Sequence, residues 1–223
     1  MERVCVFIDS GNFYHIVLKK LGIREIEFNF DGFTNFLVGE RQIIKEGKRF
    51  YVATVREGRD NHENRRAMAH QTKLFTTLKK SNWEIKPSKL RTRKEIIKID
   101  DRVYDYQKLL DLGIKEIRYE RSREKGVDVK IAVDLMVGAI DNKYDTAILV
   151  SSDTDLFPAM DWVRNRYKNK KKIEYVGFSI PQEDDEKSTR PTNTMIYYSD
   201  IQRVFIETDL KPFITQTLFN KSN

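Results

Sequence analysis

Three aspartates stand where the sequence predicts the end of a strand or the start of a helix. Asp9 follows the apolar run at 4–8, Asp153 closely follows the run at 146–150, and Asp128 opens a helical pattern. In a parallel sheet with short connections, strand carboxyl ends and helix amino termini share one edge, so we expect the three carboxylates to converge there. Clustered acids repel one another unless a cation neutralises them, and an all-oxygen site suits Mg²⁺ or Mn²⁺. Such ions activate water and offset charge on a phosphodiester during hydrolysis.

Each aspartate also has a purely structural interpretation. Asp9 could accept a hydrogen bond from the amide of Gly11, and Asp128 could be favoured at a helix start by the macrodipole. Either Asp153 or Asp155 must cap the helix that follows them. We assign the cap to Asp155 and the metal to Asp153, because one turn can hold one of each.

The elements that must position these acids alternate between strand and helix. Short apolar or β-branched runs predict strands at 4–8, 49–55, 83–85, 146–150, 173–178 and 194–199. Helical spacing predicts helices at 13–21, 31–46, 61–80, 127–139, after Pro158, and at 201–218 with an interruption at Pro212. This alternation predicts an α/β fold, and the turn at 151–155 then lies on the edge of the sheet where ligands bind.

Residues 86–125 interrupt the alternation. This segment is dense in Lys and Arg and predicts an inserted, positively charged flap, a hairpin with strands at 96–99 and 114–119 and a short helix at 104–112. Residues 181–191 are charged and lack periodicity, which predicts a mobile loop. We expect one domain over 1–180 with its basic insert at about 86–125, and a mobile loop and C-terminal extension over 181–223 packed on the same domain.

The composition favours an anionic partner. The 223 residues include 41 Lys and Arg against 34 Asp and Glu, a formal net charge of +7, and nucleic acid is the simplest polyanion to suit it. The single cysteine, Cys5, lies in an apolar strand, which excludes disulfides and a cysteine zinc site. No apolar run approaches the ~20 residues needed to cross a bilayer, and no secretory signal is visible. We therefore expect a cytoplasmic protein with no membrane partner.

Three motifs surround the acids: F-I-D-S-G-N near the start, K-G-V-D-V-K-I-A-V-D in the middle, and V-S-S-D-T-D-L-F-P after it. Together they resemble the NYN domain of the PIN-like nuclease superfamily, in its LabA-like (DUF88) branch, and they cover about residues 3–178 in the family's order. The third motif departs from the family's pattern at Ser152, where glycine is usual, and at Leu156, where Phe is common. Neither departure touches an acid.

The resemblance implies a PIN-like, Rossmann-like α/β/α sandwich with a mainly parallel central sheet, and metal-dependent ribonuclease chemistry on RNA. Asp9, Asp128 and Asp153 would be the catalytic, metal-binding acids, with Mg²⁺ or Mn²⁺ as the cofactor. Asn12, Asp134 and Asp155 match the motifs as supporting positions. By spacing, Asp134 lies about a third of a turn away from Asp128, which favours a supporting or surface role. Asn12 could either cap its helix or orient Asp9.

Basic residues near this predicted edge are candidates for RNA binding. They follow the strand at 49–55 or open the second motif: Arg56, Arg59, Arg65, Arg66 and Lys125. A solvated charged face is the ordinary explanation for such residues, and contact with phosphates is the functional one.

Rival functions make different demands on the sequence. A phosphatase of the haloacid dehalogenase type needs a second Asp two residues after Asp9, where Gly11 stands. A dinucleotide-binding enzyme needs G-x-G-x-x-G after the first strand, and that motif is absent. A PIN-like module that binds RNA or a protein partner without cutting remains the serious alternative, and a homodimer is left open.

Overall fold

A central sheet organises the computed structural model, which describes residues 1–54, 62–168 and 170–215. Six of its strands run parallel: β1 (Arg3–Asp9), β2 (Gln42–Thr54), β3 (Glu84–Lys98), β5 (Thr146–Val150), β6 (Lys172–Ser179) and β7 (Ile201–Ile206). A further strand, β4 (Glu116–Lys125), pairs with β3 in the antiparallel sense. Within the described residues the strand order is β4-β3-β2-β1-β5-β6-β7.

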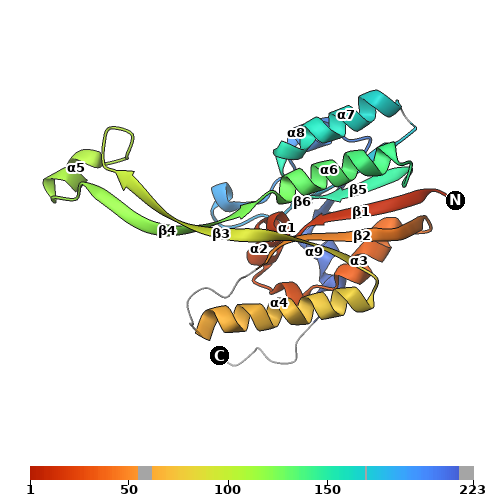
Figure 1. Ribbon diagram of the computed structural model, residues 1–223, viewed down its shortest axis with the longest axis horizontal. Helices are drawn as coiled ribbons and strands as arrows, with labels where there is room; N and C mark the ends of the chain where they lie inside the picture. Colours follow the sequence, from red (N-terminus) through yellow and green to blue (C-terminus); the bar gives the residue numbers. More distant parts are fainter. Residues whose placement is uncertain (55–61, 169, 216–223) are drawn as a thin grey trace.

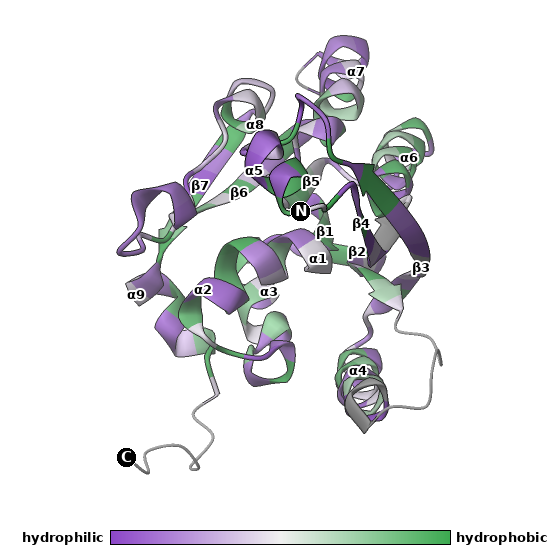
Figure 2. Cartoon of the chain, turned by 90° about the vertical axis from the view of Figure 1, so that its left-hand side faces the viewer, coloured by the Kyte–Doolittle hydropathy of each residue, from purple (hydrophilic) through white to green (hydrophobic). Residues whose placement is uncertain are grey.

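Helices cover both faces of this sheet (Figure 2). One layer contains α1 (Ser10–Phe13), α2 (Lys19–Leu21), α3 (Phe30–Val38) and α4 (His62–Lys80), and the other contains α6 (Val127–Ile140), α7 (Phe157–Tyr167) and α8 (Asn193–Tyr197). Val6 and Ile8 of β1 pack into the first core, whereas Cys5 and Phe7 pack into the second. Successive strand side chains point to opposite faces, so a strand buried on both sides is apolar throughout. The predicted α/β/α sandwich is confirmed.

The predicted helix at 31–46 is wrong beyond Val38. The helix ends at Gly39, whose φ of 59° belongs to the left-handed region that favours glycine. The chain then enters β2 at Gln42, seven residues before the strand predicted at 49–55. The β-branched pair Ile43 and Ile44 suits this early start of the strand.

The predictions for the last part of the described chain are also wrong. The strand predicted at 194–199 is instead the helix α8, and the helix predicted at 201–218 begins with β7, which pairs with β6. Phe205 is buried, whereas its neighbours Val204 and Ile206 are 44% and 49% exposed. This alternation has the period of a strand. A short helix, α9 (Glu207–Leu210), follows β7.

The basic insert forms a hairpin that projects away from the sheet (Figure 1). Strand β3 continues past β2 and pairs with β4, and the short helix α5 (Tyr106–Asp111) lies near the tip. The predicted hairpin and its helix are therefore found. The hairpin is longer than expected because the strand predicted at 83–85 is the first part of β3. We call residues 89–125 the hairpin arm.

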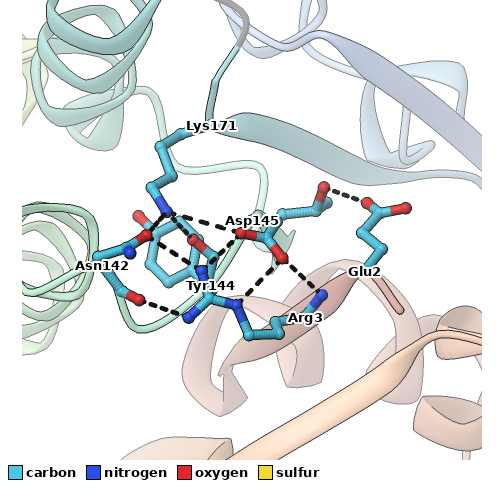
Figure 3. A network of polar contacts seen from close by, with 7 residues as sticks. Glu2, Arg3, Asn142, Tyr144, Asp145 and Lys171 are labelled. Atoms are coloured by element: carbon cyan, nitrogen blue, oxygen red, sulfur yellow. Dashed lines mark hydrogen bonds and ion pairs between the residues drawn. The ribbon is translucent and has the colours of Figure 1, made fainter.

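A polar network joins the amino-terminal ends of β1, β5 and β6, where these strands begin (Figure 3). Arg3 donates to Asp145 from Nη2 to Oδ1 at 2.7 Å and from Nε to Oδ2 at 3.1 Å. Lys171 donates to the side-chain oxygen of Asn142 and to the carbonyl of Tyr144. These contacts tie together the residues that lead into the three strands, far along the chain from one another.

The pair with Arg3 gives a prediction about pH. Hydrogen bonding from Arg3 lowers the pKa of Asp145 from 3.8 to about 2, so the folded state favours the carboxylate. This stabilisation is present above about pH 4 and is lost as the pH falls through 2. We expect Asp145→Asn to lower the free energy of unfolding by about 1 kcal/mol at pH 7, because solvent screens a partly exposed pair. Urea unfolding should show the difference shrinking between pH 4 and 2, and a pH-independent difference would contradict the ionic interpretation.

Candidate functional site

The carboxyl ends of β1 and β5 lie side by side where the connections of the sheet change direction. From β1 the chain passes through the α1–α3 layer to β2, whereas from β5 it passes through α7, on the other face, to β6. The register pairs Ile8 with Val150, so Asp9 and Ser151 leave these strands as neighbours. In open α/β sheets such a switch point is where ligands bind.

Asp9 is buried at this switch point, with 5% of its surface exposed. Its Oδ1 accepts a hydrogen bond from the amide of Asn12 at 3.0 Å and so caps α1, while its Oδ2 accepts one from the hydroxyl of Ser151 at 3.2 Å. The capping bond therefore comes from Asn12 and not from Gly11.

Burial raises the pKa of Asp9 to about 6. The hydrogen bonds from Asn12 and Ser151 oppose this rise, and the negative charges of Asp153 and Asp128 add to it. Asp9 thus experiences the repulsion of both other acids. We call Asp9, Asp128 and Asp153 the acid cluster.

Further hydrogen bonds join the loop after β1 to the loop after β5. The side-chain oxygen of Asn12 accepts from the amide of Ser152 at 2.9 Å, and the hydroxyl of Ser151 accepts from the amide of Asp153 at 3.2 Å. The Ser152 hydroxyl lies 3.0 Å from the hydroxyl of Tyr175 on β6. The Asn12 side chain therefore holds the two loops together, and its backbone amide is what contacts Asp9.

Asp153, and not Asp155, caps the helical segment after β5. The Oδ1 atom of Asp153 accepts a hydrogen bond from the amide of Asp155 at 2.9 Å, whereas the Asp155 side chain is exposed. Assigning the cap to Asp155 was wrong because a 3₁₀ turn, Thr154–Leu156, precedes α7 and moves the cap earlier. Pro158 occupies the first turn of α7, as predicted. The cap uses one oxygen of Asp153, and the other accepts no hydrogen bond from a described residue.

The two acids of α6 have different surroundings. Asp128 lies in the first turn, as predicted, and its carboxylate forms no hydrogen bond or ion pair with any described residue. Asp134 accepts a hydrogen bond from the hydroxyl of Tyr51 at 2.7 Å and lies 3.4 Å from Nζ of Lys86 and 3.7 Å from Nη1 of Arg49. These contacts of Asp134 are therefore with β2 and β3, whose cations offset its charge, and not with the acid cluster.

The carboxylates of the acid cluster suit a divalent cation that keeps several of its water ligands. Among the residues that the structure describes, no three His, Cys, Asp or Glu side chains lie close enough together to hold a metal ion. Mg²⁺ does not need three, because it keeps several waters and binds through one or two carboxylates together with substrate phosphates. A cation would also offset the burial and repulsion that raise the pKa of Asp9. The residues therefore fit Mg²⁺ or Mn²⁺ as a partly hydrated ion.

The structure describes three of the five candidate RNA-binding residues. Arg56 and Arg59 are outside the described residues. Arg65 and Arg66 are exposed near the start of α4, and the backbone of Lys125 is paired at the base of the hairpin arm.

Sequence reasoning missed two hydroxyl groups of this site, those of Ser151 and Tyr175. Ser151 links Asp9 to the amide of Asp153, and its only sequence signal is its place directly after a buried strand. Tyr175 is fully buried in β6, and a buried strand aromatic is ordinarily a core residue, so the sequence gives no sign of its contact with Ser152.

Comparison with known proteins gives one family and a shared fold. The family model described as the NYN domain matches residues 3–199. A similar solved structure is that of a protein of unknown function from Vibrio parahaemolyticus, with 17% identity, a TM-score of 0.53, and coverage of 92% of this chain and 94% of that one. At this identity the likeness shows the fold alone. The curated proteins include no match. Within the described part of the chain, no helix combines the length and apolar character needed to cross a membrane.

Proposed function

Because the chain belongs to the NYN family, a family of PIN-like nuclease domains, we propose that it is a metal-dependent ribonuclease of the LabA-like branch. Asp9, Asp128 and Asp153 would hold Mg²⁺ or Mn²⁺. The observation that carries this proposal is the buried Asp9 at the switch point, whose pKa is raised to about 6 by burial, with contributions from the other two acids. RNA provides a polyanion for a chain with a formal net charge of +7.

The residues of the site would divide the work. A bound ion of this kind would supply an activated water and offset the charge of the phosphodiester. The hydrogen bonds from Asn12 and Ser151 hold the carboxylate of Asp9 in one orientation, so little reorganisation is needed when the substrate arrives. Asp128 and the oxygen of Asp153 that takes no part in the helix cap would provide further negative charge near the ion. Below about pH 6 Asp9 takes up a proton in the folded protein, so cation binding weakens as the pH falls through that value.

Incubation of the purified protein with labelled single-stranded and structured RNA tests this proposal. We expect cleavage with Mn²⁺ or Mg²⁺, no cleavage with EDTA, and recovery when metal is added back. Asp128→Asn should lose the activity, whereas Asp141→Asn should retain it, because Asp141 lies at the opposite end of α6 beside Lys143. If both variants cut equally fast, the activity belongs to another site or to a contaminant.

One observation favours a second function, a PIN-like module that binds RNA or a protein partner without cutting. Within the described residues, no three acids lie close enough to hold a metal ion. Such a module would bind its partner equally well in EDTA and in Mn²⁺, and it would give no RNA product under either condition. The same incubation, combined with a binding measurement, therefore separates the two functions.

A further inference from the structure

The hairpin arm carries a column of like charges. Its register pairs a cation with a cation at three alternate positions: Lys89 with Lys125, Arg91 with Arg123, and Arg93 with Arg121. Alternate positions of a strand belong to one face, so all three pairs share one face of the two-stranded ribbon. We call these six residues the cation ladder. As a general rule, like charges directly opposite each other destabilise an antiparallel pair.

The positions of the other face are arranged differently. There the register pairs Lys94 with Glu120 and Lys98 with Glu116, so cations stand opposite acids. On the ladder face, the side chains of Arg93 and Arg121 are exposed and form no ion pair with any described residue. By residue type, the other face thus sets cations opposite acids, whereas the three ladder pairs join cations only, and this points to an anionic partner from outside the chain.

The ladder begins beside the acid cluster. The last residue pair of β2 and β3 joins Thr54 to Lys89, so β3 passes the carboxyl edge of the sheet at the first rung. Strand β4 ends at Lys125, directly before Gly126 and the turn of α6 that holds Asp128. The arm runs outward from this base (Figure 1). From Lys89 to Arg93 the ladder spans ~14 Å, at about 3.4 Å for each residue of the strand.

We propose that the cation ladder binds the backbone of RNA and holds the strand that enters the acid cluster. This inference rests on the proposed function, and it names the element that holds the substrate. Four of the six residues are arginines, whose planar fork matches phosphate oxygens. Regularly spaced cations on a two-stranded ribbon suit a polymer with regularly spaced charges, and phosphate contacts position RNA without reading its sequence. An acidic polypeptide fits less well, because it has no phosphodiester bond on which the chemistry proposed for the acid cluster could act.

Binding measured without turnover tests the ladder. Full-length protein carrying Asp153→Asn is titrated with labelled single-stranded RNA in EDTA at several salt concentrations. Adding Arg93→Ala with Arg121→Ala should weaken binding about tenfold at 0.15 M salt. It should also reduce the slope of log affinity against log salt by about 1.4, since each phosphate contact on a single strand contributes about 0.7. The melting temperature of this variant should equal or exceed that of its parent, because a like-charge pair is removed.

A matched control removes the same charge from the same hairpin. Lys94→Ala with Lys98→Ala changes positions that the register sets opposite acids, so the salt slope should stay within error of the parent. Equal losses in the two double variants would overturn the ladder, because general positive charge would then explain both. Polyglutamate bound as tightly as RNA, with the same sensitivity to Arg93 and Arg121, would overturn it in favour of an acidic protein partner.

The ladder and the ribonuclease can fail separately. A protein that binds RNA through the ladder but never cuts it would keep this inference and lose the proposed function. A protein that cuts RNA with Mn²⁺ but binds it equally well after Arg93→Ala with Arg121→Ala would lose only the ladder. With Mn²⁺ and an otherwise wild-type chain, we expect those substitutions to raise KM for long RNA about tenfold and to leave kcat unchanged. An effect on kcat alone would contradict a role in holding the substrate.

Discussion

The Asp153→Asn protein should cut RNA at least about 100-fold more slowly than wild type while binding RNA nearly as tightly. Asparagine keeps an oxygen that can accept the hydrogen bond from the amide of Asp155, so the cap survives the change. It removes the negative charge that Asp153 contributes beside Asp9. Loss of a group that merely supports a metal ligand costs about 10–100-fold, and loss of the ligand itself should cost more.

Single-turnover cleavage at saturating protein and Mn²⁺ measures this effect, and RNA binding in EDTA is measured in parallel. Asp161→Asn serves as the matched control, because Asp161 lies on α7, the helix after the same loop, and is no member of the acid cluster. If the Asp153→Asn protein cut RNA as fast as wild type, Asp153 would not be a metal ligand. Loss of binding together with cleavage would show that the substitution damages the RNA surface or the fold.

The strands that carry the acids could be predicted because a strand buried on both faces consists of apolar residues throughout. Both β1 and β5 are buried on two faces, so each is a short continuous apolar run, and the polar turn after it marks the edge where Asp9 and Asp153 stand. The spacing of apolar residues likewise placed Asp128 in the first turn of α6. Local sequence patterns were therefore enough to predict where these three acids stand in their elements.

Several of the errors and omissions depend instead on contacts between residues that are distant in the sequence. Residues 201–206 contain a pattern that a helix could also use, and pairing with β6 makes them a strand. Asp153 forms the helix cap because a 3₁₀ turn follows it, and the spacing of the two aspartates does not specify that turn. The cation ladder depends on the register between β3 and β4, which fixes that Arg93 stands opposite Arg121 across a long connection. Tertiary pairing decides the strand at 201–206 and the ladder, and the backbone geometry of one turn decides the cap, so a single sequence under-determines them.

In EDTA at pH 7–8, Asp9→Asn should be more stable than wild type by up to about 3 kcal/mol. The pKa of Asp9 is about 6 in the folded protein against an ordinary value of 3.8, and each unit corresponds to about 1.4 kcal/mol. Between these two values the folded state binds more protons than the unfolded state, so the stability of wild type falls as the pH rises from about 4 to 6. Asparagine is neutral, can accept from the amide of Asn12 and can donate to Ser151. The advantage of the variant should therefore be full above pH 7 and vanish near pH 4.

Added Mn²⁺ should remove most of this difference in stability. A cation that binds only the folded protein stabilises it by about 2.7 kcal/mol at a hundredfold excess over its Kd, and Asp9→Asn should gain much less. Thermal melts of both proteins, with EDTA and with Mn²⁺, measure the two effects, and Asp145→Asn provides a variant whose response to Mn²⁺ should match wild type. If Asp9 served only to cap α1, its replacement would instead lower the stability in EDTA, by up to about 2 kcal/mol, and would leave the response to Mn²⁺ unchanged. The two interpretations of Asp9 thus predict opposite signs in EDTA, and the metal response decides between them independently.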